Sequence, residues 1–552
     1  MKVSEAVADV LTGFGADTVF GLVGSGNFHV TNALIARGAR FIAARHECGA
    51  TSMADGWARM TGRPALVSLH QGPGYTNALT AITEAAKSRT PMVVLAADVG
   101  ALAKQSNFRI EMDAITRGVG AVSARLHSAG FAVDDTIRAY QLAAAERRTV
   151  VLALPLDVQA AECEGTAGRP MTAAMPTWAR STARAPDEAS VTRLAQAISR
   201  SERPVFIAGR GARIAGARPA LEQLADRCGG LLATSAAAKG LFTGNAWNLD
   251  VSGGFASPLA AELITGADLV VGWGCSLNMW TLRHGALISP GTVVAQVDLE
   301  RQAIGAHRPV HIGVTGDVTL TAEAVAQALG EGGNQLGYRS VELRDRLASE
   351  VSWRNVPYDD ESNETRIDPR TLSIALDDLL PTERIVAIDS GNFIGYPAMF
   401  MSVPDVDGFC FTQSFQSVGL GLASAIGSAI ARPDRLVVAA LGDGGALMGI
   451  SELETAVRLR LPMVIVVYDD EAYGAEVHHF GPEGYPLDTV KFPPVDIAQI
   501  ARGFGCAAAR VRQRGDLGPV AEWLDGPRDR PLLIDAKVTA NHGSWWLEEA
   551  FR

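Results

Sequence analysis

Short apolar runs alternate with helical patterns in three separate blocks of this chain, and this alternation limits the folds open to it. In the first block the runs are ARFIAA, PALVSL, TPMVVLAA and RTVVLALPL, and residues with helical spacing separate them. Strands that alternate with helices in this way form parallel sheets, because each helix carries the chain back to the end of the sheet where the previous strand began. The sequence therefore predicts an α/β fold with three doubly wound parallel-sheet domains.

Two polar tracts without a hydrophobic period separate the blocks. The first covers residues 164–189 and is rich in Ala, Pro, Thr and Gly, whereas the second runs from about residue 330 to about residue 365. Such tracts are typical of linkers. We expect domains at residues 1–163, 187–330 and 365–552. Because 47% of the 552 residues are hydrophobic, each unit is large enough to bury its own core.

The composition also narrows the partners and the compartment. A net charge of −11 and a pI near 5.5 argue against nucleic acid or an anionic membrane as the main partner. The first helical pattern carries Glu5 and Asp9, unlike a signal peptide, and no long uncharged apolar run follows. The six cysteines lie far apart without a C-x-x-C pair, which indicates neither a disulfide framework nor a zinc site. We expect a cytoplasmic enzyme or binding protein.

Two aspartates in the third block stand at the ends of neighbouring strands. Residues 435–441 and 462–468 have the composition of buried strands, and a helix expected at residues 449–460 joins them in a right-handed βαβ unit. Asp443 follows the first strand and Asp470 follows the second. Both therefore lie at the carboxyl ends of parallel strands, where open α/β sheets bind ligands.

Glycines surround the first of these aspartates. Gly442, Gly444 and Gly445 have no side chains to hinder a close approach, and their N–H groups near a helix start can face an anion. Two carboxylates beside such a pocket suit Mg²⁺ holding a diphosphate, because Mg²⁺ commonly takes one or two carboxylates together with phosphate oxygens. The alternative is a tight turn in which Asp443 only caps a helix.

This arrangement resembles the cofactor signature of thiamine-diphosphate enzymes, and the resemblance covers the whole chain. Residues 41–79, FIAARHECGATSMADGWARMTGRPALVSLHQGPGYTNAL, are similar to the pyrimidine-domain segment of the acetohydroxyacid (acetolactate) synthase and benzoylformate decarboxylase superfamily. IDSGN (388–392) and FQSVGLGLASAIGSA (415–429) resemble its two other cofactor-contacting turns. The resemblance implies a pyrimidine-binding, a middle Rossmann-like and a diphosphate-binding domain, in that order, with thiamine diphosphate and Mg²⁺ as cofactors.

Two residues match positions that act on the cofactor rings in this family. Glu47 matches the glutamate that hydrogen-bonds the aminopyrimidine ring, and a carboxyl group in an apolar pocket has a raised pKa and can share a proton with that ring. Val418 matches the apolar wedge between the two rings, where synthases usually carry Met. Without the resemblance, Glu47 would be interpreted as a surface helix residue and Val418 as a core residue.

The resemblance further implies a set of metal ligands and cofactor contacts. Asp443, Asp470 and the backbone carbonyl of Ala472 match the Mg²⁺ ligands. Most relatives carry Asn at position 470, so Asp470 adds a negative charge that Mg²⁺ must compensate, although its oxygen remains a suitable ligand. The other matching cofactor-binding positions are Pro73, Asn77, Gly391, Asn392, Gln416, Gly442, Gly444, Gly445, Tyr473 and Gly474.

Three further positions bear on the step after decarboxylation of a 2-oxo acid, which is either protonation to an aldehyde or ligation to a second carbonyl. Ser25 and His70 resemble the substrate-site serine and histidine of benzoylformate decarboxylase, and Glu476 falls where pyruvate decarboxylases place an acidic proton donor. Their structural alternatives are a helix N-cap for Ser25, a hydrogen-bonded histidine for His70 and a solvated helix face for Glu476. HQGPGYTNAL and ETAVRLRLP resemble synthases instead, although NFRIEMDAITR lacks the synthase glutamine.

We therefore predict a thiamine-diphosphate and Mg²⁺-dependent lyase or carboligase for a small 2-oxo acid, of acetolactate-synthase-like type. A benzoylformate- or pyruvate-decarboxylase-like enzyme is the alternative. A catalytically inactive binding protein would have lost Glu47 or GDG, and both are present. FAD is a further candidate at GRGARIAG, a turn that departs from G-x-G-x-x-G and gives weak support. Family members build each site from two subunits, which implies a homodimer or homotetramer.

Overall fold

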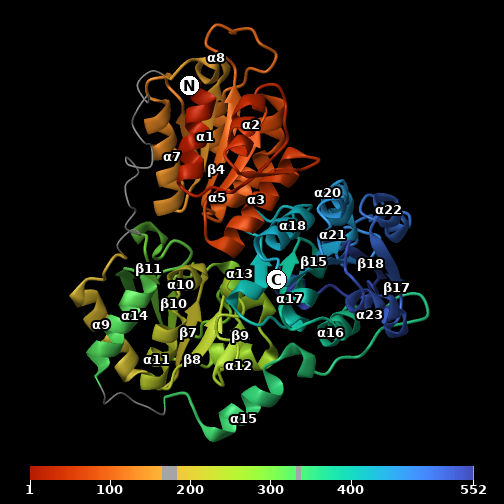
Figure 1. Ribbon diagram of the computed structural model, residues 1–552. Helices are drawn as coiled ribbons and strands as arrows, with labels where there is room; N and C mark the ends of the chain where they lie inside the picture. The colour runs from red at the N-terminus through yellow and green to blue at the C-terminus, as the bar shows by residue number, and fades with distance from the viewer. Residues whose placement is uncertain (164–182, 331–336, 551–552) are drawn as a thin grey trace.

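The computed structural model describes residues 1–163, 183–330 and 337–550, and it arranges them in three α/β units (Figure 1). Each unit contains one six-stranded sheet, whose neighbouring strands are parallel. Helices lie on both faces of these sheets. The predicted fold class, three doubly wound parallel sheets, is confirmed. Within the described ranges, no helix is long and apolar enough to cross a membrane.

The first unit has the strand order β2-β1-β3-β4-β6-β5. Its strands are β1 (Thr18–Gly21), β2 (Arg40–Ala43), β3 (Ala65–Leu69), β4 (Met92–Asp98), β5 (Val122–Arg125) and β6 (Thr149–Pro155). Its helices are α1 (Val3–Gly13), α2 (Phe28–Ala36), α3 (Glu47–Thr61), α4 (Pro73–Asn77), α5 (Leu79–Lys87), α6 (Met112–Gly118), α7 (Ala132–Ala145) and α8 (Leu156–Ala160).

The middle unit has the order β12-β11-β10-β7-β8-β9, which is the strand order of a Rossmann fold. Its strands are β7 (Pro204–Ala208), β8 (Leu231–Thr234), β9 (Asn248–Val251), β10 (Leu269–Trp273), β11 (Val293–Asp298) and β12 (Ile312–Thr315). Its helices are α9 (Glu188–Arg200), α10 (Arg210–Ala215), α11 (Arg218–Cys228), α12 (Pro258–Thr265), α13 (Met279–Leu282) and α14 (Val318–Leu329), and α15 (Val341–Glu350) follows them.

The third unit repeats the strand order of the first, as β14-β13-β15-β16-β18-β17. Its strands are β13 (Arg384–Ile388), β14 (Phe409–Phe411), β15 (Leu436–Gly442), β16 (Met463–Asp469), β17 (Ala507–Val511) and β18 (Leu532–Lys537). Its helices are α16 (Pro369–Leu379), α17 (Gly395–Phe400), α18 (Gly421–Ala431), α19 (Asp443–Met448), α20 (Glu452–Arg458), α21 (Gly474–Phe480), α22 (Ile497–Phe504), α23 (Gly518–Asp525) and α24 (Trp545–Ala550).

The strands of each unit fall within one predicted domain range, while the domain limits remain predictions. Residues 164–182 of the first expected linker and 331–336 of the second lie outside the described residues. Helix α9 already begins at Glu188, because the Asp187 side chain accepts a hydrogen bond from Ser190 N and caps it.

The helix predicted at residues 449–460 is present as α20 but is shorter, from Glu452 to Arg458. A second helix that the sequence did not predict, α19, forms directly after β15. Gly449 is the C-cap of α19, and a Cβ at this position would lie 3.2 Å from the carbonyl oxygen of Gly419. The helix therefore ends where the chain must pass close to the turn that precedes α18.

Helices α3 and α18 join the first and third units by backbone contact, and Figure 1 shows them side by side. A Cβ at Gly56 would lie 2.2 Å from the carbonyl oxygen of Ser424, and a Cβ at Gly427 would lie 1.9 Å from that of Met53. Only glycine permits this approach. One continuous hydrophobic core accordingly includes α3, α18 and strands of both sheets.

These two contacts also fix the relative direction of the helices. Residue 53 faces residue 427 and residue 56 faces residue 424, so α3 and α18 run antiparallel. Glu47 begins α3, and Val418 lies just before α18. The two residues therefore lie toward opposite ends of the packed pair, whose longer member spans about 22 Å at 1.5 Å per residue.

Replacing Gly427 by alanine should destabilise the protein, because the added methyl group meets the main chain of α3. We expect a loss of about 1–3 kcal/mol, typical of overpacking a core. The control is Gly503→Ala in α22, where nothing lies within 4 Å of the new methyl group and alanine should be neutral or slightly stabilising. Thermal unfolding checks both variants, and equal midpoints would contradict the account of this contact.

Candidate active site

The predicted diphosphate-contacting residues gather at the carboxyl ends of β13, β15 and β16. Gly442 ends β15 and occupies the N-cap position of α19, so Asp443 is the first residue of the helix and does not cap it. Gly444 and Gly445 follow in the first turn. After β16, Asp470 and Ala472 form the turn to α21, which begins at Gly474 behind Tyr473.

The turns around Asp443 touch one another closely. A Cβ at Gly474 would lie 2.2 Å from Asp470 Oδ2 and 3.3 Å from the side chain of Asn392. A Cβ at Gly445 would lie 2.3 Å from Asp389 Oδ2 and 3.2 Å from Val418 Cγ1. The sites after β13, after β15, after β16 and before α18 therefore form one cluster, as the sequence predicts.

Asn392 is fixed from the C-terminal part of the chain. Its Oδ1 accepts a hydrogen bond from Ser544 N at 2.9 Å, and its carbonyl oxygen accepts from Ser544 Oγ and from Trp546 Nε1. Gly391, which precedes it, has φ 142°, a value that glycine adopts readily. No pattern in the sequence indicated that residues near position 544 hold this turn.

Asp389 is a site residue that sequence reasoning missed. Its carboxylate accepts hydrogen bonds from Ser390 N at 2.9 Å and from Gly419 N at 2.9 Å, and it is 1% exposed. Burial raises the pKa of Asp389 to about 6, although these hydrogen bonds oppose the rise. The sequence feature that could have identified Asp389 is its position directly after strand β13. Asp389 ties the IDSGN turn to the turn that carries Val418.

The neighbouring aspartates after β16 have different environments. Asp469 forms a buried ion pair with Lys537, whose ammonium group also donates to Val495 O. Asp470 instead lies beside Gly474, and its Oδ1 accepts a hydrogen bond from Ala472 N at 3.2 Å. Of these two aspartates, Asp469 is therefore engaged by a cationic side chain.

Asp443 and Asp470 repel one another in a largely buried setting. Burial raises the pKa of Asp443, and the nearby carboxylates of Asp470 and Asp469 raise it further. Burial likewise raises the pKa of Asp470, against the hydrogen bond from Ala472 N. Two like charges held together in this way are stabilised by a shared cation.

The donor set fits Mg²⁺ only with added oxygen ligands. In the described part of the chain, no group of three or more His, Cys, Asp or Glu side chains could hold a metal. Two carboxylates, a backbone carbonyl and diphosphate oxygens would complete a Mg²⁺ shell. A cavity of about 310 Å³ opens beside Asp443, whereas Asp470 and Ala472 do not line it. Its lining consists of Asp443, Gly444, Leu447, Met448, Asp469, Glu471, Tyr473, Phe492, Pro493, Val495 and Ile497.

A second cluster forms in the first unit around Glu47. This carboxylate is 7% exposed, and its Oε2 accepts a hydrogen bond from Asn77 Nδ2 at 3.0 Å, at the end of α4. Pro73 begins α4, and a Cβ at Gly74 would lie 3.3 Å from Glu47 Oε1. Glu47 is thus a buried residue rather than a surface one.

His70 and the loop of Ser25 belong to the same cluster. His70 Nδ1 accepts a hydrogen bond from Gly26 N at 3.1 Å. Partial burial lowers the pKa of His70, and the charge of Glu47 opposes this effect. Ser25 is exposed in this loop, and Asn27 rather than Ser25 occupies the N-cap position of α2. His70 is therefore hydrogen-bonded, and both it and Glu47 lie beside Gly74.

Glu452 is a second residue that sequence reasoning missed. Its Oε1 accepts hydrogen bonds from Arg45 N at 3.1 Å and from His46 N at 3.0 Å, directly before Glu47. Burial raises the pKa of Glu452, and these bonds oppose the rise. No local pattern could reveal it, because the partners are 406 and 407 residues apart in the chain.

Within one chain the two clusters face different ways. Glu47 lies toward one end of the α3–α18 pair and Val418, which is 38% exposed, toward the other. Gln416 precedes it with φ 61°, a strained value for a residue other than glycine. Glu476 is exposed on α21. The structure therefore gathers the cofactor-contacting residues in two groups, and it does not unite these groups within the chain.

The glycine turn considered for FAD has a structural explanation. A Cβ at Gly209 would lie 2.3 Å from the carbonyl oxygen of Gly274, and a Cβ at Gly211 would lie 2.7 Å from the Cα of Gly274. Both glycines are required where the turn after β7 packs against the turn after β10. They do not by themselves point to a dinucleotide.

Comparison with known proteins relates both groups of residues to domains that bind thiamine pyrophosphate. Three models of the thiamine pyrophosphate enzyme family match this chain. The N-terminal TPP binding domain matches residues 1–116, the central domain matches residues 191–325, and the C-terminal TPP binding domain matches residues 389–536. The chain is 28% identical to a probable 2-ketoarginine decarboxylase of Pseudomonas aeruginosa over 94% of this chain and 90% of that protein.

Two further relatives have other activities in their names. A sulfoacetaldehyde acetyltransferase of Alcaligenes xylosoxydans xylosoxydans is 27% identical over 86% of this chain and 82% of that protein. The acetolactate synthase isozyme 2 large subunit of Escherichia coli is 25% identical over 99% of this chain and 97% of that protein. Both matches extend over most of each chain.

The carboxylate pair predicts how pH and metal affect stability. The pKa of Asp443 rises from 3.8 to about 8 in the folded, metal-free protein, chiefly through burial. The folded state then holds more protons than the unfolded chain between these values, so its stability falls as pH rises through that window. Asp443→Asn should flatten this fall by about 1 kcal/mol or more between about pH 5 and pH 7.5.

Mg²⁺ should reverse this effect, because it favours the ionised pair. We expect Mg²⁺ to raise the thermal midpoint of the wild-type protein more at about pH 8 than at about pH 6. The exposed Asp488→Asn variant serves as control. A pH profile of Asp443→Asn that matches the control would refute the assigned charge coupling.

Proposed function

Because the chain belongs to the thiamine pyrophosphate enzyme family, we propose that it is a thiamine-diphosphate and Mg²⁺-dependent enzyme that acts on 2-oxo acids in the manner of acetolactate synthases. The observation that carries this proposal is the meeting of four turns around Asp443 at the carboxyl ends of β13, β15 and β16. Open parallel sheets bind ligands at this edge. A cation there would relieve the repulsion within the buried carboxylate pair.

The third unit would hold the diphosphate and its metal. Asp443, Asp470 and the carbonyl oxygen of Ala472 would bind Mg²⁺, and the backbone N–H groups of the glycine turns would face the phosphate oxygens. Thiamine diphosphate supplies an acidic ring carbon that, once deprotonated, can add to a 2-oxo group. The contacts with this cofactor would come from Gly391, Asn392, Gln416, Val418, Gly442, Gly444, Gly445, Tyr473 and Gly474.

The first unit would supply the carboxyl group that exchanges a proton with the cofactor. Glu47 lies buried at the start of α3, where Asn77 hydrogen-bonds one carboxylate oxygen and Gly74 leaves the other approachable. A carboxyl group in this position can exchange a proton with the pyrimidine ring of the cofactor. Pro73 would contact the same ring, and His70, next to Glu47, would face the substrate.

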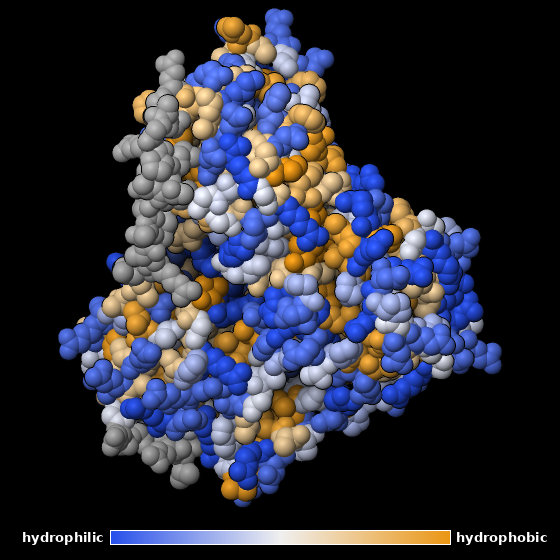
Figure 2. All heavy atoms as spheres, viewed as in Figure 1, coloured by the Kyte–Doolittle hydropathy of each residue, from blue (hydrophilic) through white to orange (hydrophobic). Residues whose placement is uncertain are grey.

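Each active site would combine two chains. The antiparallel packing of α3 and α18 directs Glu47 and Val418 toward opposite ends, so a second copy must supply the missing half. Four large apolar side chains near the diphosphate cluster are also exposed: Phe415, Val418, Leu447 and Met448. Figure 2 shows further apolar residues at the surface where the first and third units meet. Such surface is typical of an interface, and we infer a homodimer or homotetramer.

The fate of the decarboxylated substrate distinguishes the two candidate reactions. Ligation to a second carbonyl requires that no acid protonates the intermediate first. His70 and Glu476 are the titratable residues that would supply such a proton. These residues support the alternative, a decarboxylase that releases an aldehyde, as in pyruvate or benzoylformate decarboxylases. The names of the relatives include a synthase, an acetyltransferase and a decarboxylase, and favour neither outcome alone.

A substrate panel tests the proposed function. The protein, loaded with thiamine diphosphate and Mg²⁺, is incubated with 2-oxo acids that differ in size and charge, with and without an acceptor aldehyde or a second 2-oxo acid. Release of CO₂ with 2-hydroxyketone or 2-hydroxy-2-methyl-3-oxo acid product supports the synthase-like reaction. CO₂ with aldehyde alone supports the decarboxylase. No CO₂ from any 2-oxo acid would overturn both.

Glu476 should influence how the products divide. If its carboxyl group protonates the intermediate, Glu476→Leu should lower the fraction of aldehyde by about tenfold or more and raise the fraction of ligated product. The control is Glu483→Leu, which changes another exposed glutamate beyond the same helix. Chromatography at matched CO₂ release measures the ratio. Equal product ratios for Glu476→Leu and the control would remove Glu476 from this role.

A further inference from the structure

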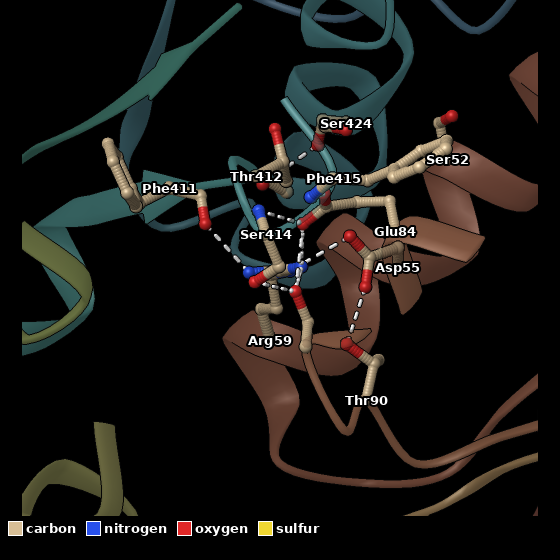
Figure 3. Close-up of polar contacts among 12 residues, drawn as sticks. Ser52, Asp55, Arg59, Glu84, Thr90, Phe411, Thr412, Ser414, Phe415 and Ser424 are labelled. Atoms are coloured by element: carbon tan, nitrogen blue, oxygen red, sulfur yellow. Dashed lines mark hydrogen bonds and ion pairs between the residues drawn. The ribbon is translucent and has the colours of Figure 1, made fainter. Parts of the chain in front are cut away.

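A buried polar network, whose side chains are not among those of the two clusters described above, crosses from the first unit to the third (Figure 3). Its side chains come from α3, α5 and the residues just after α5, and they point toward the chain between β14 and α18. Asp55 and Glu84 are each 1% exposed, and Ser88 is 2% exposed. Carboxylates buried to this extent require strong hydrogen bonds.

Glu84 binds the main chain of the third unit with both of its oxygens. Oε1 accepts a hydrogen bond from Ser414 N at 3.1 Å, and Oε2 accepts one from Phe415 N at 2.6 Å. Ser88 Oγ lies 2.8 Å from both Glu84 Oε1 and Ser414 Oγ. A carboxylate that accepts two consecutive backbone N–H groups fixes the direction of that chain segment.

Arg59 binds the end of β14, directly before the same segment. Nη1 donates to the carbonyl oxygen of Phe411 at 2.7 Å, and Nη2 donates to Glu84 Oε1 at 2.9 Å. Its Nε donates to Asp55 Oδ2 at 2.9 Å, and Thr90 Oγ1 donates to the other oxygen of Asp55. The guanidinium group is therefore oriented by Asp55 and directed at both the strand end and Glu84.

The segment that leaves this network is also held at its far end. Phe415 is followed by Gln416, with φ 61°, and by Val418, and then Gly419 N donates to Asp389 at 2.9 Å. Residues 416–418 thus lie between two buried carboxylates, one from each unit. The strained backbone of Gln416 requires such support, since an unsupported loop would relax it.

We propose that Glu84 and Arg59 are positioning residues, which hold the 416–418 turn in the geometry that receives the cofactor. The inference rests on the proposed function, because the turn contains Val418, the expected wedge between the cofactor rings. The network reaches the turn through backbone N–H and C=O groups, so it fixes the main chain whatever side chains the turn carries. Helix α3 consequently bears Glu47 at its first residue and orients the Val418 turn from Arg59, near its last.

The test compares cofactor affinity in matched variants. Glu84→Gln keeps the shape but replaces one acceptor oxygen with an N–H donor that faces a backbone N–H. The control is Asp135→Asn in α7, another buried carboxylate of the first unit. Asp135 accepts a hydrogen bond from His127 N at 3.0 Å and a longer one from Arg138, and both partners belong to the first unit. Both variants should lower the thermal midpoint.

Only Glu84→Gln should weaken thiamine diphosphate binding, by about tenfold or more in saturating Mg²⁺, the size expected for losing a charged hydrogen bond. Isothermal titration calorimetry measures the affinity. Hydrogen exchange should show faster exchange at Phe415 N–H in Glu84→Gln, with core strands β13 and β15 unchanged. Equal affinities for Glu84→Gln and Asp135→Asn would overturn the inference.

Ser88→Ala provides a milder change should Glu84→Gln not fold. It removes only the hydroxyl that contacts Glu84, Ser414 and Arg59, and it should give faster exchange at residues 414–415 and a smaller loss of cofactor affinity. Unchanged exchange there would also contradict the inference. The wild-type titration distinguishes failure of this inference from failure of the proposed function: if the wild type does not bind thiamine diphosphate with Mg²⁺, the proposed function itself fails.

Discussion

The contact of α3 with α18 through Gly56 and Gly427 is the constraint on which the rest of the structure depends. Because the two helices meet backbone to backbone, neither can rotate or shift without a collision with carbonyl groups. Their antiparallel direction decides where each functional element points. It separates Glu47 from Val418 in one chain, and it places Arg59 beside the end of β14. The separation of the two clusters within the chain and the support of the Val418 turn both follow from this packing.

Buried carboxylates that accept backbone N–H groups recur along this seam. Glu452 of the third unit holds Arg45 N and His46 N before Glu47, and Glu84 of the first unit holds Phe415 N before Val418. The two units therefore each fix the main chain of the other. Such charge-assisted bonds are strong and directional in a buried setting. They make the geometry of the site depend on the packing of the units rather than on the loops themselves.

The sequence predicted the parts of this picture that depend on local patterns. Alternating strands and helices indicated the parallel sheets, and strand ends placed Asp443 and Asp470 together, because their positions follow from sheet topology. Contacts between distant segments could not be predicted in this way. Glu84 lies 331 residues before Phe415, and the ion pair of Asp469 with Lys537 also joins segments that are far apart in the chain. The helix break at Gly449 likewise arises from packing against Gly419.

The most direct test of a site shared by two chains is a mixture of Glu47→Gln and Asp443→Ala proteins after subunit exchange. The readout is the exchange of the thiazolium C2 proton of bound thiamine diphosphate with solvent deuterium, which Glu47→Gln should slow about 10²–10⁴-fold. In an equal mixture, half of the dimers would combine the two variants, and each of these would have one intact site of two. Sites without Asp443 would not hold the metal and the cofactor, so fast exchange should return at about a quarter of the sites. Slow exchange in a mixture that has demonstrably exchanged subunits would contradict the account.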